Sequence, residues 1–281
     1  MTPVWPDVWR VMSAQALADG IGGRVWRIRT EDGARAVIKQ ISEKARDDAK
    51  HALAYLSWRN GLGAIRLLDA IGDFQLLEDA GHLTLAQVLE RDGDAEATRI
   101  AADVLTRLGA PGPAPVDLPS MRDRFASLMT LQPTADSLLR EAQIRLEGLL
   151  ALPHSPRPLH GDIHHDNILH GPRGWLAIDP HGLIGDPAYD AANLFYNPLE
   201  RQDLRTSTDR AQALAGVLAP AVGRPVSVVL AYGFCHACLS SVWYSEDGEE
   251  AQAQAGLDVA RAIRPLLDDA GGLFRVGERP H

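Results

Sequence analysis

The chain has 281 residues, of which 46% are hydrophobic and 23% charged, and these ordinary globular values exclude wholesale disorder. Its formal net charge of −9 disfavours nucleic-acid and membrane partners and suits a cationic one, because like charges repel. The amino terminus has no basic start followed by an apolar run, which predicts no signal peptide, and two cysteines fit a reducing compartment. We therefore expect a cytoplasmic protein.

The first eighty residues have the pattern of a β-sheet with one helix. Strands are expected at residues 24–29, 36–39, 64–70 and 74–77. The first two flank the turn signal Glu31-Asp32-Gly33, which predicts a hairpin. The polar run 42–58 predicts the helix. Together these elements predict a small β-rich unit over residues 1–79.

From Gly81 onward the spacing of apolar residues changes to that of helices. Helices are expected at 83–90, 95–108, 121–129 and 135–150, with a proline-rich loop at 109–120. The stretch 225–244 is long enough to cross a bilayer, but its serines, glycine and histidine favour a buried helix. Its two cysteines, Cys235 and Cys238, predict core packing, because a structural zinc needs four ligands and there is no second pair. We expect a larger, mainly helical unit over residues 80–281.

The strongest chemical signal is a polar loop that begins His160-Gly161-Asp162 and continues to Asn167. Asp179 follows twelve residues later, after a short apolar stretch. Phosphoryl transfer needs a carboxylate that orients the acceptor hydroxyl and takes its proton, and two oxygen ligands that hold Mg²⁺ against the phosphates. The order and spacing match the catalytic loop of protein kinases. The sequence therefore predicts Asp162 as the catalytic carboxylate and Asn167 and Asp179 as magnesium ligands.

Other interpretations fit this loop when it is taken alone. It can be an ordinary polar loop, or a metallohydrolase site, because His160, His164 and His165 are close together. A non-catalytic nucleotide-binding module is a third alternative. The features upstream of the loop favour a kinase that uses ATP.

Three upstream segments fit a nucleotide site. Lys39 ends a short apolar strand, as does the kinase lysine that contacts the α- and β-phosphates. The segment with Gly22 and Gly23 precedes the hairpin and can cover phosphates with backbone N–H groups. The segment Glu78-Asp79-Ala80 marks the change from strand to helix, where main-chain groups of Glu78 and Ala80 can meet adenine. Among Glu43, Asp47 and Asp48, we expect Asp48 to pair with the lysine.

The chain resembles the aminoglycoside phosphotransferase family, and more closely its streptomycin 6-phosphotransferase and hydroxyurea-resistance kinase branch. The broad family motif is matched by residues 160–167 and 178–179. The branch-level likeness rests on Trp58-Arg59-Asn60-Gly61, Arg122-Asp123-Arg124-Phe125, Gly174-Trp175-Leu176, Ala191-Ala192-Asn193-Leu194-Phe195-Tyr196 and Asp247-Gly248-Glu249-Glu250. The chain departs from the family at Ala49, where the glutamate expected after Lys39 is absent, and in its non-standard glycine loop.

The resemblance implies an α+β, bilobal, protein-kinase-like fold, with ATP and Mg²⁺ between a β-rich lobe and a helical lobe. It also implies a small alcohol as acceptor, for which we expect a cationic aminoglycoside of the streptomycin type. Four acids crowd residues 246–250, and we expect Asp247 and Glu250 to bind the guanidinium groups of such a substrate. The same acids also suit a solvated helix start that Ser245 caps. A metabolic kinase for a sugar, amino alcohol or hydroxyurea stays open, as do ATP or GTP preference and oligomeric state.

Overall fold

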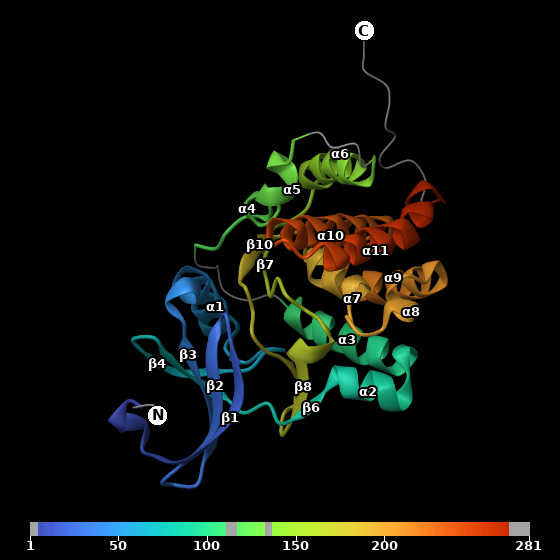
Figure 1. The fold of residues 1–281 in the computed structure, drawn as a ribbon. Helices are drawn as coiled ribbons and strands as arrows, with labels where there is room; N and C mark the ends of the chain where they lie inside the picture. Colours follow the sequence, from blue (N-terminus) through green and yellow to red (C-terminus); the bar gives the residue numbers. More distant parts are fainter. Residues whose placement is uncertain (1–4, 111–116, 133–136, 270–281) are drawn as a thin grey trace.

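The computed structural model describes residues 5–110, 117–132 and 137–269, and it places a small sheet lobe beside a larger helical lobe (Figure 1). The expected α+β, bilobal fold is confirmed. The last strand of the small lobe ends at Glu78, close to the predicted boundary after residue 79. Residues 1–4 and 270–281, which the two predicted units include, and half of the predicted loop 109–120 (residues 111–116) lie outside the described residues.

The small lobe is an antiparallel sheet with strand order β1-β2-β3-β5-β4. Its strands are β1 Val11–Gly20, β2 Gly23–Thr30, β3 Arg35–Ile41, β4 Leu67–Ile71 and β5 Phe74–Glu78. Helix α1, Arg46–Arg59, follows a 3₁₀ turn at Glu43–Ala45 and ends where Asn60 takes a left-handed conformation. The sequence did not predict β1, because this edge strand exposes nearly every side chain and so lacks an alternating apolar pattern.

The large lobe consists of helices and a few short strands. The helices are α2 Leu85–Asp92, α3 Asp94–Leu108, α4 Met121–Arg124, α5 Ala126–Thr130, α6 Ser137–Ala151, α7 Ala192–Tyr196, α8 Gln202–Arg205, α9 Thr208–Val222, α10 Val226–Glu246 and α11 Glu250–Asp269. Two expected helices differ in detail. The helix expected from Leu83 begins at Leu85, because Thr84 caps it in a reciprocal capping box with Gln87. The helix expected over 121–129 is split into α4 and α5 at Phe125.

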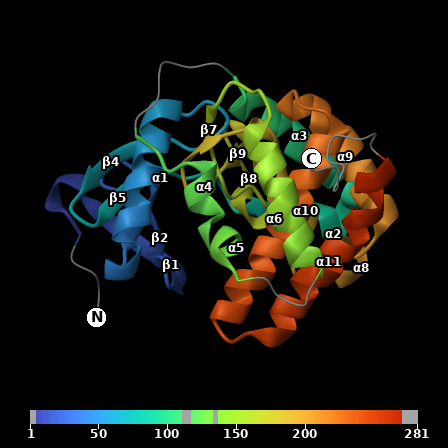
Figure 2. The ribbon, with the colours of Figure 1, turned by 90° about the horizontal axis from the view of Figure 1, so that it is seen from above.

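Helix α10 forms the centre of the large lobe and packs against α6, α7, α9 and α11 (Figure 2). Among the described residues it is one helix that is long and apolar enough to cross a membrane, but 83% of its most apolar window is buried inside the protein. The expected buried helix is therefore confirmed. Cys235 and Cys238 are free thiols buried in this core, as expected.

Short strands and 3₁₀ turns hold the polar loop against the helices. They are β6 Leu83–Thr84, β7 Arg157–Leu159, β8 Ile168–Gly171, β9 Gly174–Ala177, β10 Leu183–Gly185, η3 His165–Asn167 and η4 Pro187–Ala191. Strand β8 pairs with β6 and β9, and β10 pairs with β7. Residues 160–167 therefore connect β7 to β8, each of which is paired with another strand, and Asp179 lies two residues after the end of β9.

A charged clamp joins the two lobes beside their connection. Arg173, in the turn between β8 and β9, donates two hydrogen bonds to the carboxylate of Glu78, at 2.6 and 2.5 Å. Arg173 also donates to the carbonyls of Gly61 and Ala64, and Glu78 accepts the N–H of Arg66 at 2.9 Å. Burial alone would raise the pKa of Glu78, but Arg173 holds it below its ordinary value. The clamp fixes the end of β5 against the helical lobe.

We expect Glu78→Gln to reduce the free energy of unfolding by about 1–3 kcal/mol, because it removes the charge from a bidentate, half-buried pair. Urea unfolding at neutral pH measures this change. The matched control is Glu147→Gln, which breaks the exposed pair between Glu147 and Arg122 at 2.9 Å and should cost less than about 0.5 kcal/mol. Equal losses of unfolding free energy in the two variants would show that the clamp stabilises the protein no more than an exposed ion pair does.

Candidate active site

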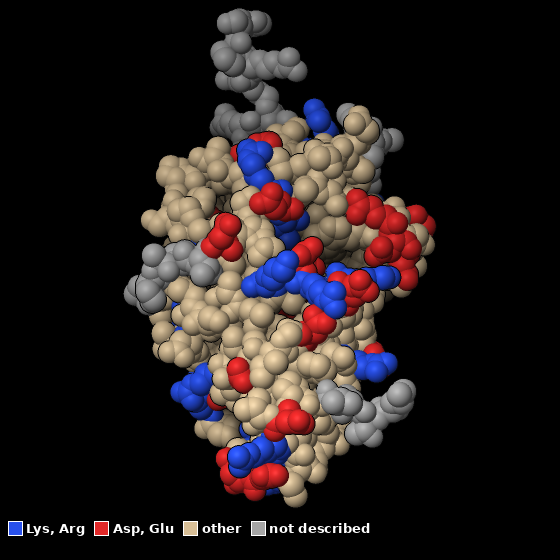
Figure 3. Space-filling model, turned by 90° about the vertical axis from the view of Figure 1, so that its left-hand side faces the viewer, with Lys and Arg blue, Asp and Glu red and all other residues tan. Residues whose placement is uncertain are grey.

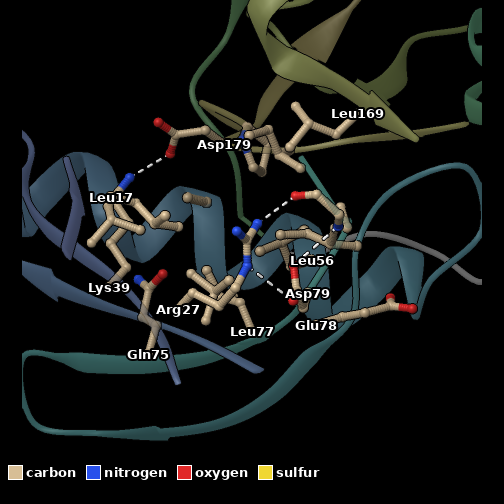
Figure 4. Close-up of a pocket in the computed structure, with 18 residues that line it drawn as sticks. Leu17, Arg27, Lys39, Leu56, Gln75, Leu77, Glu78, Asp79, Leu169 and Asp179 are labelled. Carbon is tan, nitrogen blue, oxygen red and sulfur yellow. Dashed lines mark hydrogen bonds and ion pairs between the residues drawn. The ribbon is translucent and has the colours of Figure 1, made fainter. Parts of the chain in front are cut away.

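A cavity between the lobes is lined by three of the six residues predicted to bind nucleotide (Figure 4). Apolar side chains from β1, β2, β3, β5 and α1 form one side, and Leu169, Ile178 and Asp179 of the large lobe form the other. Its lining includes Lys39, Glu78 and Ala80. The predicted lysine strand and the predicted hinge therefore meet at one site.

Lys39 forms an ion pair with Asp179 across the cavity (Figure 4). Lys39 belongs to β3 of the small lobe and Asp179 to the large lobe, so this contact bridges the two. The expected partner Asp48 is wrong for the described structure. Asp48 lies exposed on α1 and lines a different cavity, and in the part of the chain that the structure describes it forms no ion pair with Lys39. The side chain on α1 that lines the nucleotide cavity near Lys39 is that of Ala52, which cannot pair with a cation.

The connection between the lobes presents backbone groups to the cavity. No hydrogen bond within the described residues uses the N–H or C=O of Ala80, which lines the cavity. The carboxylate of Glu78, in contrast, belongs to the clamp with Arg173 and points away from the cavity (Figure 4). Any contact of Glu78 with a nucleotide must therefore use its backbone. Arg27 orders this segment by donating to Asp79 at 3.1 Å and to the carbonyl of Gly81 at 2.6 Å.

The two glycines predicted to cover phosphates lie at the turn between β1 and β2. Gly22 has open space around it, whereas Gly23 lies against the backbone of β3. A Cβ at Gly23 would lie 1.9 Å from the carbonyl oxygen of Gln40, and Gly23 has φ +130°. Packing against β3 therefore requires glycine at this position, whatever a ligand requires. The cavity is lined by Leu17 and Val25 on either side of the turn, and the role of both glycines stays a prediction.

Both carboxylate oxygens of Asp162 accept hydrogen bonds. Asn167 donates its Nδ2 to Oδ2 at 3.0 Å, and Asn193 donates its Nδ2 to Oδ1 at 2.9 Å. The ring nitrogens of His164 and His181 lie 3.7 and 3.8 Å from Oδ2. Burial would raise the pKa of Asp162, but these histidines and other nearby cationic groups hold it below its ordinary value. The carboxylate is thus ionised at neutral pH and can accept a proton.

The loop that carries Asp162 is held from beneath by Asp190 and by the ring of His160. Asp190 accepts the N–H of His160 at 3.1 Å and that of Gly161 at 2.7 Å. The Nε2 of His160 contacts the carbonyl of Ile178 at 2.9 Å, and its Nδ1 accepts the N–H of Asp162. Burial lowers the pKa of His160 to about 4, so the ring is neutral and can both donate and accept. Both residues therefore support the structure of the loop.

Asn167 and Asp179, the two predicted metal ligands, lie on backbone segments that are hydrogen-bonded to each other. The N–H of Ile178, next to Asp179, donates to the carbonyl of Asn167 at 2.9 Å. The Nδ2 of Asn167 is committed to Asp162, which leaves its Oδ1 without a hydrogen bond to any other described residue. Asp179 has φ +55°, a strained conformation for a non-glycine residue that is common at functional sites. An amide oxygen and a carboxylate are ligands that suit Mg²⁺, so the residues fit the predicted metal.

A second cavity, of about 380 Å³, opens on the other side of the segment that follows Asp179. Its lining includes His181 and Arg124, together with the acids Asp48 and Asp123 from the two lobes. Asp179 lines the first cavity and His181 the second, so this short segment forms the wall between them. A molecule in the second cavity can therefore approach Asp162, which His181 contacts.

The acids predicted to bind substrate lie at the turn between α10 and α11. Asp247 and Glu250 are exposed, and Glu250 lines a groove together with Glu246, whereas neither of the two cavities is lined by Asp247. The groove adjoins the second cavity, because Ser127 lines that cavity and donates to Glu246 at 3.2 Å. Figure 3 shows acidic side chains gathered at one edge of the helical lobe. The substrate role of Asp247 and Glu250 stays a prediction.

Two site residues were not predicted from the sequence. Asn193 appeared only within a family-like segment, and nothing in its spacing indicated that it contacts Asp162. Gln75 lies opposite Lys39 on β5, is 4% exposed and lines the nucleotide cavity. An alternating strand pattern places Gln75 on the inner face, and a polar residue there is the signal that could have revealed it.

Comparison with known proteins agrees with this geometry. Residues 8–248 match the model of the aminoglycoside/hydroxyurea antibiotic resistance kinase family. A streptomycin 3''-kinase of Klebsiella pneumoniae is 34% identical over 253 residues, covering 86% of this chain and 93% of the relative. A streptomycin 6-kinase of Streptomyces glaucescens is 33% identical over 276 residues, covering 92% of this chain and 86% of the relative.

Among solved structures, an amicoumacin kinase in complex with AMP-PNP, Ca²⁺ and Ami has a similar fold. The TM-score is 0.64 at 15% identity, and the match covers 93% of this chain and 90% of that one. With a kinase-like pair of lobes, a lysine and a carboxylate facing each other between them, and this extent of similarity, the chain is a phosphotransferase that belongs to the aminoglycoside/hydroxyurea antibiotic resistance kinase family.

Proposed function

We propose that this phosphotransferase moves the γ-phosphate of ATP, with Mg²⁺, onto a hydroxyl group of a cationic aminoglycoside of the streptomycin type. One observation carries the proposal: Asp179 lines the nucleotide cavity, and His181, two residues later, lines the second cavity and lies 3.8 Å from the carboxylate of Asp162. A phosphoryl donor and an acceptor alcohol can approach one carboxylate from opposite sides in this arrangement.

The nucleotide is expected to lie between the apolar faces of Val25 and Val37 and the large-lobe residue Leu169. The free N–H and C=O of Ala80 are suited to the hydrogen-bonding edge of adenine. Lys39 would contact the phosphates, since its ammonium group faces the large lobe at Asp179. The Oδ1 of Asn167 and the carboxylate of Asp179 would hold Mg²⁺, which neutralises charge on the phosphates and so favours attack by an oxygen nucleophile.

Asp162 would orient the acceptor hydroxyl and take its proton. As the new bond forms between the acceptor oxygen and the γ-phosphorus, the bond from that phosphorus to the β–γ bridging oxygen breaks, and ADP leaves. The proton moves from the hydroxyl to the carboxylate, which is ionised at neutral pH because its pKa is lowered. The two amide donors on Asp162 restrict its rotation, so the carboxylate is already oriented before the acceptor arrives.

The acceptor is expected in the second cavity. Guanidinium groups pair well with carboxylates, and this cavity brings Asp48 and Asp123 together from two lobes. Asp123 uses one oxygen to cap α4 through Ser120, whereas Asp48 is exposed and forms no ion pair with another described residue. We therefore give Asp48 the leading role in binding, with Glu250 and Asp247 at the outer edge. Each proposed contact is open to test by neutralisation of one charge.

Replacing Asp162 with asparagine should lower kcat by roughly 10²–10⁴-fold, because the shape is kept and the proton acceptor is lost. ATP affinity should change little. Streptomycin-dependent ADP formation by purified protein measures kcat, and equilibrium titration measures ATP binding. The control is Asp166→Asn in the same loop, where the carboxylate is 60% exposed and only approaches His164. An Asp162→Asn enzyme with wild-type kcat would remove Asp162 from the mechanism.

Removal of divalent metal with EDTA should abolish turnover, and added Mg²⁺ should restore it. The Asp179→Asn variant should need more Mg²⁺ for half-maximal activity and turn over much more slowly, because a neutral amide is a weaker ligand than a carboxylate. A Mg²⁺ titration of both proteins at fixed ATP gives the comparison. Full activity of metal-stripped wild-type protein would contradict the assignment.

Neutralising Asp48 should raise KM for streptomycin by roughly threefold to tenfold, and more at low salt than at high salt. KM for ATP should stay the same, because Asp48 does not line the nucleotide cavity. The matched control is Asp47→Asn, the adjacent residue of α1, which pairs with Lys50 at 2.7 Å. The same assay on Asp247→Asn and Glu250→Gln tests the outer acids. If streptomycin elicits no ADP formation while a neutral alcohol does, the aminoglycoside is the wrong substrate class.

A further inference from the structure

A buried chain of hydrogen bonds leads from the wall of the second cavity to Asp162. It begins at Arg124, which lines that cavity and stacks over the ring of Trp243 at 4.5 Å. Arg124 donates its Nε–H to the hydroxyl of Tyr189 at 2.9 Å. The hydroxyl of Tyr189 in turn meets Nδ1 of His236, on α10, at 3.3 Å. The chain thus passes from the surface into the core of the large lobe.

The second half of the chain reaches the carboxylate. Nε2 of His236 lies 3.0 Å from Oδ1 of Asn193, and Nδ2 of Asn193 donates to Oδ1 of Asp162 at 2.9 Å. Oδ1 of Asn193 also accepts from Nδ2 of Asn197 at 2.8 Å. Side chains from α4, η4, α10 and α7 are therefore linked one after another, and the last of them, Asn193, contacts one oxygen of Asp162.

Every donor and acceptor in this chain has one consistent direction. The hydroxyl of Tyr189 already accepts from Arg124, so its single proton is available to Nδ1 of His236. A neutral imidazole that accepts at Nδ1 carries its proton on Nε2, which can then donate to Oδ1 of Asn193. With its oxygen facing His236 and Asn197, Asn193 must turn its NH₂ group toward Asp162.

We propose that Asn193 and His236 are positioning residues, and that Tyr189 sets the His236 tautomer that keeps the NH₂ of Asn193 on Asp162. This inference rests on the proposed role of Asp162 as proton acceptor. The chain works in one direction only. Loss of the Tyr189 hydroxyl frees the ring to adopt the other tautomer, in which Nε2 accepts and the amide of Asn193 is drawn to turn over. Its oxygen would then face the carboxylate and repel it.

Two observations favour a functional role for this chain over the alternative, that these buried polar groups are hydrogen-bonded only because burial requires it. Tyr232 lies beside Tyr189, with ring centroids 6.0 Å apart, and its buried hydroxyl has no hydrogen-bond partner among the described residues. This core therefore does not pair every hydroxyl, yet all groups from Tyr189 to Asp162 are paired. Burial also lowers the pKa of His236 to about 3, so its ring remains neutral, as a single tautomer requires.

Tyr189→Phe and Tyr232→Phe form a matched pair, since each removes one buried hydroxyl from neighbouring tyrosines. We expect Tyr189→Phe to lower kcat by roughly tenfold or more, the scale of lost supporting contacts at active sites, with KM for ATP unchanged. Tyr232→Phe should stay within about twofold of wild type. Equal kcat values for the two variants would overturn the proposal.

His236 allows a rescue test. His236→Leu removes the donor to Asn193 and should lower kcat at least as much as Tyr189→Phe. His236→Gln places an amide N–H near the position of Nε2 and should recover part of that loss. Thermal unfolding and ATP binding, measured on each variant, separate a positioning effect from a general loss of fold. Equal defects in the leucine and glutamine variants, both folded and able to bind ATP, would count against the chain.

The tautomer itself can be read without any turnover. In ¹⁵N-labelled wild-type protein at pH 7.5, the His236 ring should show a protonated Nε2 and an unprotonated Nδ1, and Tyr189→Phe should change this pattern. A wild-type ring protonated on Nδ1, or on both nitrogens, would overturn the proposal even if a variant fails to fold. The Asp162→Asn variant keeps the two proposals apart. If it is inactive while Tyr189→Phe matches Tyr232→Phe, the chain is wrong and the assignment of Asp162 stands.

Discussion

The active site depends on the capture of two backbone N–H groups by one buried carboxylate. Asp190 accepts from His160 and Gly161, and without it both amides would face an apolar core with no partner. A buried polar group left unpaired costs about 1–3 kcal/mol, so the polar loop could not lie against the helices on its own. The cost appears at Asp190 itself, where burial raises the pKa to about 6 although the two accepted hydrogen bonds oppose this. Asp190 thus fixes the backbone of the two residues that precede Asp162.

The candidate active site combines side chains from two lobes of different construction. The sheet lobe contributes Lys39 on a central strand, where antiparallel neighbours on both sides hold the backbone. The helical lobe contributes Asp162, Asn167 and Asp179 from loops whose ends are tied by β7, β8 and β9. Catalytic side chains on short loops between paired strands combine reach with rigidity. The ion pair between Arg173 and Glu78 holds the sheet lobe in place relative to the helical lobe, and so helps to position these side chains relative to one another.

The sequence predicted the parts of this protein that depend on local pattern. Strand and helix periodicity predicted the two lobes, and the spacing of Asp162, Asn167 and Asp179 predicted the candidate catalytic loop, because that chemistry needs those groups within one short segment. Partners across the fold were not predictable. Lys39 meets Asp179, 140 residues away, instead of an acid on the next helix, and Asn193 reaches Asp162 only because α7 packs against α10. β1 escaped because an exposed edge strand has no buried face to impose a pattern.

The ion pair between Lys39 and Asp179 affects how well a nucleotide, a metal ion or a complex of the two can bind in the cavity between the lobes. A ligand that takes only the lysine leaves Asp179 without its cation, and a free metal ion that takes only Asp179 leaves the lysine without its anion. Lys39 is the more buried of the two, with 19% of its side chain exposed, so the cost of stranding it is the greater. A metal–nucleotide complex satisfies both charges at once. Under the proposed function, the pair would therefore favour binding of MgATP over ATP or Mg²⁺ alone, and the binding of the nucleotide and of the metal ion would reinforce each other.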